Sequence, residues 1–195
     1  MPVTAVKPAT KKGAATSRRI LDAAAAEFAE FGIAGARVER ITAAAQTNKA
    51  QLYGYFGSKD GLFDAVIADR VTSTTAAIPF DVERIPEWAV QVYDENLRHP
   101  ELTRLIAWVR LERRRSGTWF DGSDHDAKLA AITEAQAEGR IRQGDPFTLL
   151  TMIISMASTW SAASEVYTAT ADEPESVHES RRTLLRESVA RLLAP

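Results

Sequence analysis

The chain has 195 residues, enough to bury a hydrophobic core and to form one large domain or two small ones. Hydrophobic residues make up 45% and charged residues 26%, as in ordinary soluble proteins. The sequence contains no cysteine, which excludes disulfides, thiolate metal sites and a cysteine nucleophile and fits a reducing cytoplasm.

The charge is distributed unevenly along the chain. Residues 1–60 contain nine Lys or Arg and five Asp or Glu, whereas the remaining residues contain 15 basic and 21 acidic side chains. A basic N-terminal module on an acidic body is typical of a nucleic-acid-binding protein with a second domain that does not bind nucleic acid. A disordered basic tail is the alternative, and residues 1–15 are predicted to form such an arm without a signal peptide.

The first helix is predicted to begin at Thr16 or Ser17, either of which can cap it, and to end at Gly32. Its predicted core face repeats at helical spacing and comprises Ile20, Leu21, Ala24, Phe28 and Phe31. Arg18 and Arg19 fall in the first turn, where the helix dipole disfavours cations. They are interpreted either as phosphate contacts or as solvated side chains.

Residues 37–63 contain two short helical patterns separated by a break. Val38, Ile41 and Ala45 mark the apolar face of the first, and Leu52 re-enters the core from the second, which covers about 48–53. Two short helices joined by a three- or four-residue turn form a helix-turn-helix unit, whose second helix can enter the major groove of DNA. Gln46 in the turn is expected to bear a steric cost in a left-handed conformation.

The second helix of this unit carries side chains suited to DNA. Asn48 and Gln51 can pair bidentately with adenine, and Lys49 can bind guanine or phosphate. Ala50 is small enough to approach a thymine methyl group. We therefore predict a DNA-binding surface in which the following residues contact bases or phosphates: Arg37, Asn48, Lys49, Ala50, Gln51, Tyr53 and Tyr55.

The rest of the chain is predicted to be helical. Four Pro residues stand where a first helical turn tolerates them, at positions 86, 100, 146 and 174, and no stretch alternates strictly as a strand would. The predicted fold is all-α with about nine helices. Beyond the first three, the expected ranges are 58–75, 86–98, 100–115, 124–139, 146–167 and 175–193.

The segment from Val38 to Phe63 resembles the TetR family of bacterial transcriptional regulators. The matching residues are Val38, Ile41, Ala45, Asn48, Lys49, Leu52, Tyr53, Tyr55, Phe56, Ser58, Lys59, Leu62 and Phe63. The resemblance implies a DNA-binding domain at 16–60, with Tyr55 and Lys59 on the DNA backbone, and an effector-binding and dimerisation domain at 61–195. It also implies repression relieved by a small molecule. The sequence departs from the family pattern at Ala36-Arg37, Gln46 and Thr47.

The same resemblance implies two further partners. A small organic effector is expected among aromatic residues of the body, and Trp88, Trp108, Met156 and Trp160 are the candidate ligand contacts, although such residues are also ordinary core residues. A homodimer is expected through the helices at 146–167 and 175–193, which would place two recognition helices on a pseudo-palindromic operator. No cofactor is expected.

Two other functions are weighed against this one. An enzyme or metal protein would have to use the polar residues Asp121, Asp124, His125 and Asp126, which are better explained as a polar loop that caps the following helix. A helix-turn-helix protein that acts only through protein partners would not need the polar face of residues 48–51. The uncharged run 147–164 contains too many Ser and Thr to span a membrane, so no membrane partner is expected.

Overall fold

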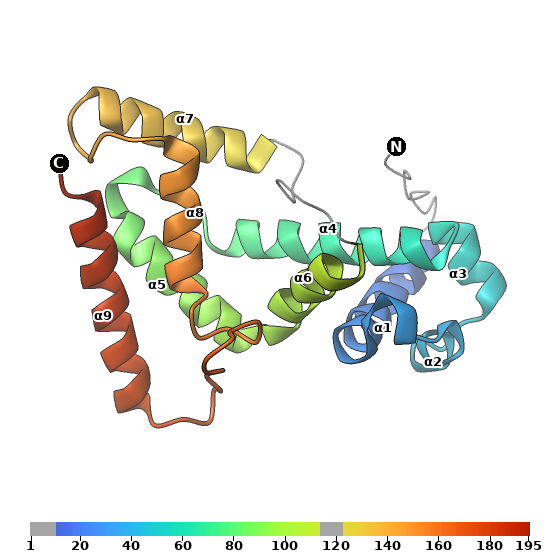
Figure 1. The fold of residues 1–195 in the computed structure, drawn as a ribbon. Coiled ribbons are helices and arrows are strands. Elements are labelled where there is room, and N and C mark those ends of the chain that lie inside the picture. Colours follow the sequence, from blue (N-terminus) through green and yellow to red (C-terminus); the bar gives the residue numbers. More distant parts are fainter. Residues whose placement is uncertain (1–10, 114–122) are drawn as a thin grey trace. The chain divides into compact units, whose positions relative to one another are not determined.

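The computed structural model describes residues 11–113 and 123–195 (Figure 1). Within these residues the chain forms nine α-helices and one short 3-10 helix, and no strand, which confirms the all-α prediction. The helices are α1 (Lys11–Gly35), α2 (Val38–Ala44), α3 (Lys49–Phe56), α4 (Lys59–Ala77), η1 (Val82–Arg84), α5 (Ile85–Arg98), α6 (Pro100–Arg113), α7 (Ser123–Ala137), α8 (Pro146–Ala157) and α9 (Glu175–Leu193).

The helices gather into two compact units. The first comprises α1 to α3, α4 as far as Ser73, and α6. The second comprises the end of α4, η1, α5, α7, α8 and α9. The sequence places its functional boundary between residues 60 and 61, whereas the packing assigns most of α4 and all of α6 to the N-terminal helices.

The core of the first unit is built on α1. Ile20, Ala24 and Phe28 are fully buried, and the Phe28 ring meets the ring of Phe63 edge to face at a centroid distance of 5.0 Å. The predicted core residue Phe31 is instead 45% exposed, and the guanidinium of Arg40 lies 4.2 Å above its ring. The helix is broken at Gly32, which has φ +70°, so Ile33 turns inward in place of Phe31.

Helix α1 begins earlier than expected. Residues 11–15 were predicted to belong to the disordered arm, but they are helical. The predicted arm boundary at residue 15 is therefore corrected, because α1 begins at Lys11. Lys11, Lys12, Ala14 and Ala15 are good helix formers and extend the helix before the expected cap. Thr16 is consequently inside the helix and buried, where it accepts a weak 3.5 Å hydrogen bond from Arg19.

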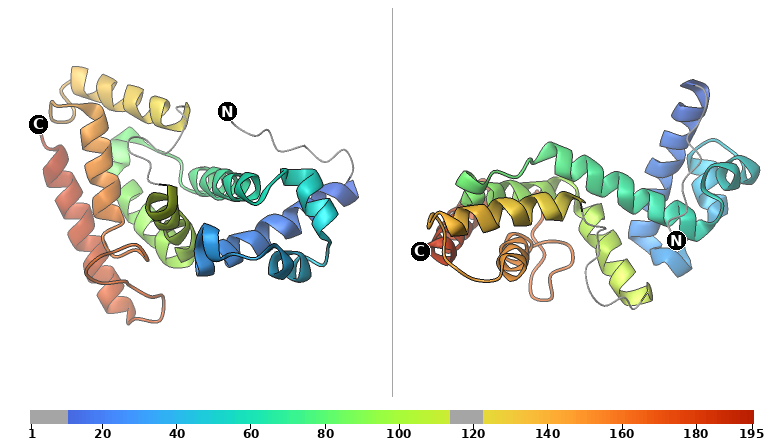
Figure 2. Two further views of the ribbon diagram at one scale, coloured as in Figure 1. Left: turned by 45° about the vertical axis from the view of Figure 1, so that its right-hand side comes forward. Right: turned by 90° about the horizontal axis from the view of Figure 1, so that it is seen from above.

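In the second unit, α5 packs against both α8 and α9 (Figure 2). Trp88 and Tyr93 of α5 are buried, and α9 contributes Leu185, Val189 and Leu193 to the same core. Helix α8 begins as its sequence predicts, because Asp145 Oδ2 accepts the backbone N–H of Thr148 at 2.7 Å and Pro146 occupies the first turn.

Helix α8 ends at Ala157, ten residues before its predicted end at 167. The run of hydroxyl residues after Ala157 explains the difference. Ser161 Oγ accepts the N–H of Ala163, and Ser164 Oγ accepts those of Val166 and Tyr167, so side chains replace the helical carbonyl partners. Residues 158–174 therefore form an irregular segment between α8 and α9.

The turn between α2 and α3 carries the strain that the sequence predicts. Gln46 has φ +50°, and it is the one residue other than glycine with a positive φ in the described ranges. We expect Gln46→Gly to raise the free energy of unfolding by about 0.5–1 kcal/mol, because glycine adopts this conformation without a Cβ clash. Ala43→Gly, in the right-handed backbone of α2, should lower it by about 1 kcal/mol. Urea unfolding measures both changes in the free energy of unfolding. Changes of the same sign in the two variants would contradict the explanation.

Candidate nucleic-acid interface

Helices α2 and α3 are held together by a small apolar core. Ile41 and Ala45 from the first helix and its C-cap, and Leu52 and Phe56 from the second, are at most 3% exposed. The turn is closed by the N–H of Thr47, which donates to the carbonyl of Thr42 at 3.0 Å. The predicted helix-turn-helix unit is therefore present, and its buried residues are the ones that the spacing indicated.

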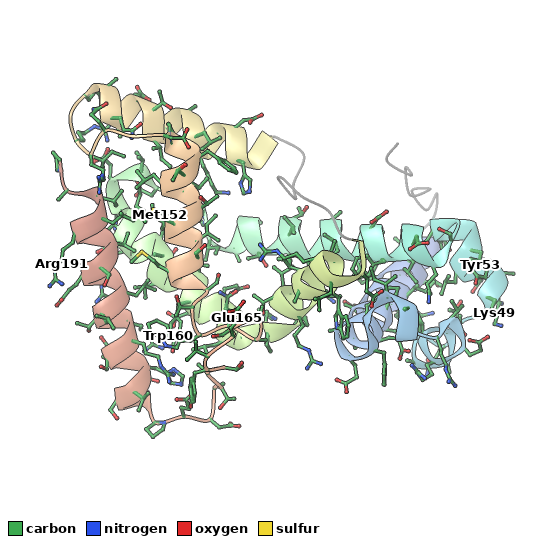
Figure 3. The ribbon with its side chains drawn as sticks, in the orientation of Figure 1. Lys49, Tyr53, Met152, Trp160, Glu165 and Arg191 are labelled. Carbon is green, nitrogen blue, oxygen red and sulfur yellow. The ribbon has the colours of Figure 1, made fainter. Side chains whose placement is uncertain are left out.

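The outer face of α3 is polar and exposed. Lys49, Ala50 and Gln51 are exposed, and Tyr53 is 42% exposed. Figure 3 shows Tyr53 projecting from α3 away from the other helices of this unit, with Lys49 at the start of α3. Nothing in the core requires these side chains, so this face is free to meet a partner.

Asn48 has a structural role that its predicted role as a base reader did not include. It is the N-cap of α3, and its Oδ1 accepts the backbone N–H of Gln51 at 2.9 Å. The cap uses only the amide oxygen and leaves the NH₂ group as a donor. Thr47 Oγ1 is in turn hydrogen-bonded to Gln51 Oε1, so the hydroxyl of the turn orients a second predicted base reader.

Lys49 is paired with Glu39 of α2 at 2.5 Å, and both side chains are exposed. The hydrogen bond between them raises the pKa of Lys49 and lowers that of Glu39. We expect Glu39→Gln to strengthen DNA binding about two- to fivefold, because it frees Lys49 and removes a negative charge near the phosphates. Fluorescence anisotropy with a DNA duplex measures the affinity. Weaker binding by this variant would show that Glu39 holds Lys49 in its binding position.

Three other predicted DNA contacts lie at the edges of the unit. Arg37 precedes α2, where its N–H donates to Glu27 Oε1 at 2.8 Å and its side chain is exposed. Tyr55 is half-buried beside Phe56. Lys59 is half-buried, and its Nζ donates to the carbonyls of Ala34 and Ala36, each at 3.2 Å, so it ties the start of α4 to the end of α1.

Comparisons with known proteins agree with this geometry. Residues 20–66 match the model for "Bacterial regulatory proteins, tetR family", and residues 84–191 match that for "Tetracyclin repressor-like, C-terminal domain". The HTH-type transcriptional repressor SCO4008 of Streptomyces coelicolor is 37% identical over 148 residues, which cover 74% of this chain and 77% of that protein. The chain belongs to the TetR family.

Further relatives and solved structures support the assignment. The A-factor receptor protein of Streptomyces griseus is 28% identical over 87% of this chain and 62% of its own length. The regulator SCO4942 from Streptomyces coelicolor has a TM-score of 0.74 and 31% identity, over 91% of this chain and 98% of that one. AibR, solved with isovaleryl coenzyme A and operator DNA, shares the fold with a TM-score of 0.62 and 19% identity, over 92% of this chain and 99% of its own.

As a TetR-family member, the chain is a DNA-binding transcriptional regulator.

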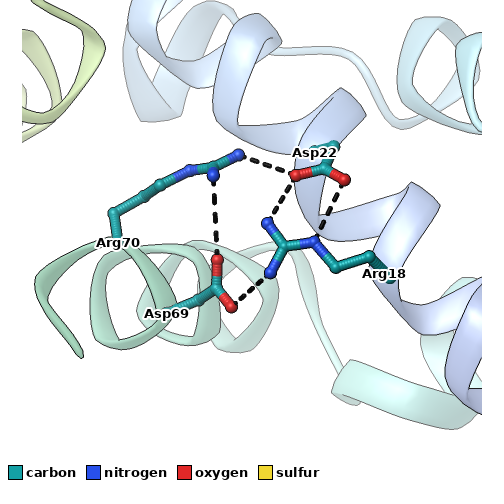
Figure 4. A network of polar contacts seen from close by, with 4 residues as sticks. All are labelled: Arg18, Asp22, Asp69 and Arg70. Atoms are coloured by element: carbon teal, nitrogen blue, oxygen red, sulfur yellow. Dashed lines mark hydrogen bonds and ion pairs between the residues drawn. The ribbon is translucent and has the colours of Figure 1, made fainter. Parts of the chain in front are cut away.

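Four charged side chains connect two helices of its first unit, a network that the sequence did not predict (Figure 4). Arg18 of α1 bonds Asp22 at 2.5 Å and Asp69 of α4 at 2.7 Å, and Arg70 of α4 bonds Asp22 at 2.9 Å. The hydrogen bond from Arg18 lowers the pKa of Asp22. Arg18 therefore joins α1 to α4, a role that neither earlier interpretation contains.

Arg19 likewise serves the helix-turn-helix unit of this TetR-family regulator. Its Nε donates to the carbonyl of Ala45, the C-cap of α2, at 3.1 Å. Glu27 is buried and is bonded by Arg40 and by the N–H of Arg37. Burial alone would raise the pKa of Glu27, but these hydrogen bonds outweigh it and lower the pKa. Both contacts fix the position of α2 on α1.

Helix α6 of the regulator is hydrogen-bonded to the C-terminal end of α1, where that helix is interrupted at Gly32. Arg104 Nε and Trp108 Nε1 donate to the carbonyl of Ala29 at 3.0 and 3.2 Å. The two carboxylate oxygens of Glu112 accept the N–H groups of Ile33 and Ala34 at 3.0 and 2.8 Å. We call Arg104, Trp108 and Glu112 the α6 stripe. Their i, i+4, i+8 spacing is a sequence signal for one helix face, but it does not name the surface that the face meets.

The predicted ligand residues divide between the two units. Trp108 is part of the α6 stripe in the first unit. Trp88 is buried in the second, with its Nε1 donating to the Ile78 carbonyl at 3.3 Å, and Met156 and Trp160 are partly buried and pack against the same core. Only the last three therefore belong to the unit in which they were expected.

The alternative metal site receives no support from the part of the chain that the structure describes. Asp121 and the side chain of Asp124 lie outside the described residues. Among the described residues, no group of three or more His, Asp or Glu side chains could hold a metal ion. None of the described helices is both long and apolar enough to cross a membrane.

Proposed function

We propose that this TetR-family regulator is a cytoplasmic repressor that binds a pseudo-palindromic operator as a homodimer and leaves it when a small organic molecule binds. In this proposal residues 16–60 bind DNA, and residues 61–195 bind the effector and form the dimer. The observation that carries the proposal is the exposed polar face of α3 on a rigidly anchored helix-turn-helix unit. No cofactor takes part.

Each residue of the surface has an assigned role. The Asn48 NH₂ group, Lys49 and Gln51 contact base edges, and the Ala50 methyl group lies against a thymine. Arg37, Tyr53 and Tyr55 bind phosphates on either side. Lys59 uses two of its three N–H donors on carbonyls, so its third remains for a phosphate.

Operator binding is tested on DNA from the region upstream of the protein's own gene. The affinity should exceed that for a random duplex by at least about a thousandfold and should fall steeply with salt. Lys49→Ala should weaken binding and relax the sequence preference at the base pair that Lys49 contacts. Equal affinity for upstream and random DNA would overturn the operator proposal.

The outward faces of α8 and α9 support a homodimer. Phe147 and Met152 of α8 and Leu184 of α9 are exposed by 40%, 47% and 54%. An open hollow runs along α9, lined by Ser176, Glu179, Ser180, Thr183, Leu184 and Glu187. Large exposed apolar side chains beside small ones are typical of a helix-packing surface. A two-fold dimer would place its recognition helices about 34–36 Å apart, one turn of DNA.

We expect Leu184→Glu to break the dimer without unfolding the chain. The side chain lies outside the core, so the change adds charge only to the proposed interface, and the dimer dissociation constant should rise at least tenfold. Val166→Glu is the matched control, because Val166 is 94% exposed on the segment between α8 and α9. Light scattering after size exclusion measures both. A dimer that survives Leu184→Glu would place the interface elsewhere.

The effector is assigned to residues 61–195, where Trp88 belongs to the second core and Met156 and Trp160 pack against it. AibR, a fold neighbour, holds an acyl coenzyme A and operator DNA, which supports a regulator with both kinds of partner. Adding the effector should release the operator, and the release can be followed in the same anisotropy assay.

A further inference from the structure

A group of polar side chains lies inside the second unit, away from the DNA-binding helices. Tyr93 of α5 and His178 of α9 are 1% and 3% exposed, and Tyr93 Oη lies 2.7 Å from His178 Nδ1. Arg181, one turn further along α9, has a side chain that is 14% exposed. We call these three residues the buried polar cluster. Packing of the hydrophobic core does not require any of their polar atoms.

The hydrogen bonds show which polar atoms of the cluster are used. Arginine has only donors, and Arg181 Nη2 donates to Glu173 Oε2 at 2.8 Å. Tyr93 Oη is hydrogen-bonded to His178 Nδ1, and in the tautomer whose Nδ1 accepts, the phenol O–H is the donor. A neutral His178 that accepts at Nδ1 carries its proton on Nε2.

Two donors of the cluster are then left over. His178 Nε2 and Arg181 Nη1 are both inaccessible to solvent, and neither has a hydrogen-bond partner among the described residues. Buried side-chain donors are nearly always paired in folded proteins. His178 and Arg181 stand three positions apart on α9, and therefore on the same side of that helix, so one acceptor group with two oxygens can serve both donors.

Aromatic rings surround the arginine. The Arg181 guanidinium lies 5.8 Å from the ring centroid of Trp160 and 5.3 Å from that of Tyr167, and Trp160 also meets Tyr93 edge to face at 5.8 Å. Trp160 and Tyr167 belong to the irregular segment 158–174, and Tyr167 is half exposed. The backbone N–H of Ala169 donates to the carbonyl of Trp160 within this segment. The ion pair of Glu173 with Arg181 at 2.8 Å holds the segment beside the cluster.

We propose that the buried polar cluster binds the carboxylate of a small aromatic or otherwise flat acid. One carboxylate oxygen accepts from His178 Nε2 and the other from Arg181 Nη1, while the flat body packs against Trp160 and Tyr167. Glu173 already neutralises part of the guanidinium charge, which favours a monoanion over a phosphate dianion. The inference rests on the proposed function, since this acid would be its effector.

The probes are benzoate, phenylacetate and indole-3-acetate, with the matching neutral amides and inorganic phosphate as comparisons. Isothermal titration of the full-length protein should show that at least one carboxylate binds at least tenfold more tightly than its amide and than phosphate. Carboxylates that bind no more tightly than their amides at millimolar concentration would overturn the proposal.

The site is located with substitutions on α9. Arg181→Gln and Arg181→Lys should each weaken carboxylate binding at least tenfold, because Gln lacks the charge and neither side chain has the planar guanidinium that bonds Glu173 through Nη2 while Nη1 faces the ligand. Arg191→Gln is the matched control, since Arg191 lies on the same helix in an exposed ion pair with Glu187, and it should change the affinity less than twofold (Figure 3). Tyr167→Ala, which alters a half-exposed side chain, should weaken binding without affecting the fold. An equal loss in Arg191→Gln would show a general charge effect and overturn the assignment.

Failure of this inference can be told from failure of the proposed function. Upstream DNA bound tightly with no carboxylate bound would refute the cluster as a site and leave the operator proposal intact. A carboxylate that binds through Arg181 but does not release the DNA would confirm the site and refute its role as an effector site.

Discussion

Asn48→Asp will leave α3 folded and lower operator affinity by about tenfold or more. Asn48 Oδ1 caps the helix through the Gln51 N–H, and an aspartate oxygen can make the same bond with a favourable helix dipole. The change removes the NH₂ donors that would read a base and adds a negative charge facing the phosphates. Losing the recognition of one base pair costs about 1–3 kcal/mol.

Asn48→Ala separates the cap from base recognition. It removes both the cap and the donors, so it should lower the free energy of unfolding by about 1 kcal/mol as well as the affinity. Thermal unfolding and duplex anisotropy, measured on both variants, give the two quantities independently. Operator affinity in Asn48→Asp equal to that of the wild type would mean that Asn48 only caps α3.

Gly32→Ala will destabilise the first unit by about 4 kcal/mol. Gly32 has φ +70°, and a Cβ there would lie 2.3 Å from Glu112 Oε1 and 2.9 Å from Trp108 Cε3. The left-handed backbone costs about 1–2 kcal/mol with a side chain present. Displacing Glu112 also breaks its two bonds to the Ile33 and Ala34 amides, and hydrogen bonds to a charged group are worth about 1.5–3 kcal/mol each.

Gly139→Ala supplies the control for the backbone contribution. Gly139 also has φ +70°, but nothing lies within 4 Å of the position that a Cβ would take there, so only about 1 kcal/mol should be lost. Urea unfolding of both variants gives the difference, which measures the contact with α6. Equal losses of unfolding free energy in the two variants would show that the α6 stripe moves away from the new methyl group at no cost in free energy.

Local sequence signals predicted the recognition unit well. The spacing of Ile41, Ala45 and Leu52 identified the buried side of α2 and α3, because each helix must bury one face. The strain at Gln46 was expected from the resemblance to the family, in which a glycine usually stands at this position of the turn. Asn48 was identified as a base reader but not as the cap, although it precedes the helix at the position that capping residues prefer.

Longer-range partners were not predictable. Lys59 was predicted to contact phosphate, and Arg18 to contact phosphate or solvent; the structure adds bonds from both to groups that are distant along the chain. Trp108 was a candidate ligand contact, and the structure adds a bond from its Nε1 to the carbonyl of Ala29. A charged or aromatic side chain satisfies many partners equally well, so its residue type does not select one.

The sequence by itself determined three properties: the all-α fold class, the position of the helix-turn-helix unit, and the residues that form the buried core of that unit. These properties follow from hydrophobic periodicity and capping, which act within one or two helical turns. Only the tertiary structure showed that α6 bonds to α1 next to Gly32 and that α8 ends at Ala157. It also showed that His178 and Arg181 lie near Tyr93. Those contacts join residues that are distant in sequence, and their energies depend on the geometry that brings them together.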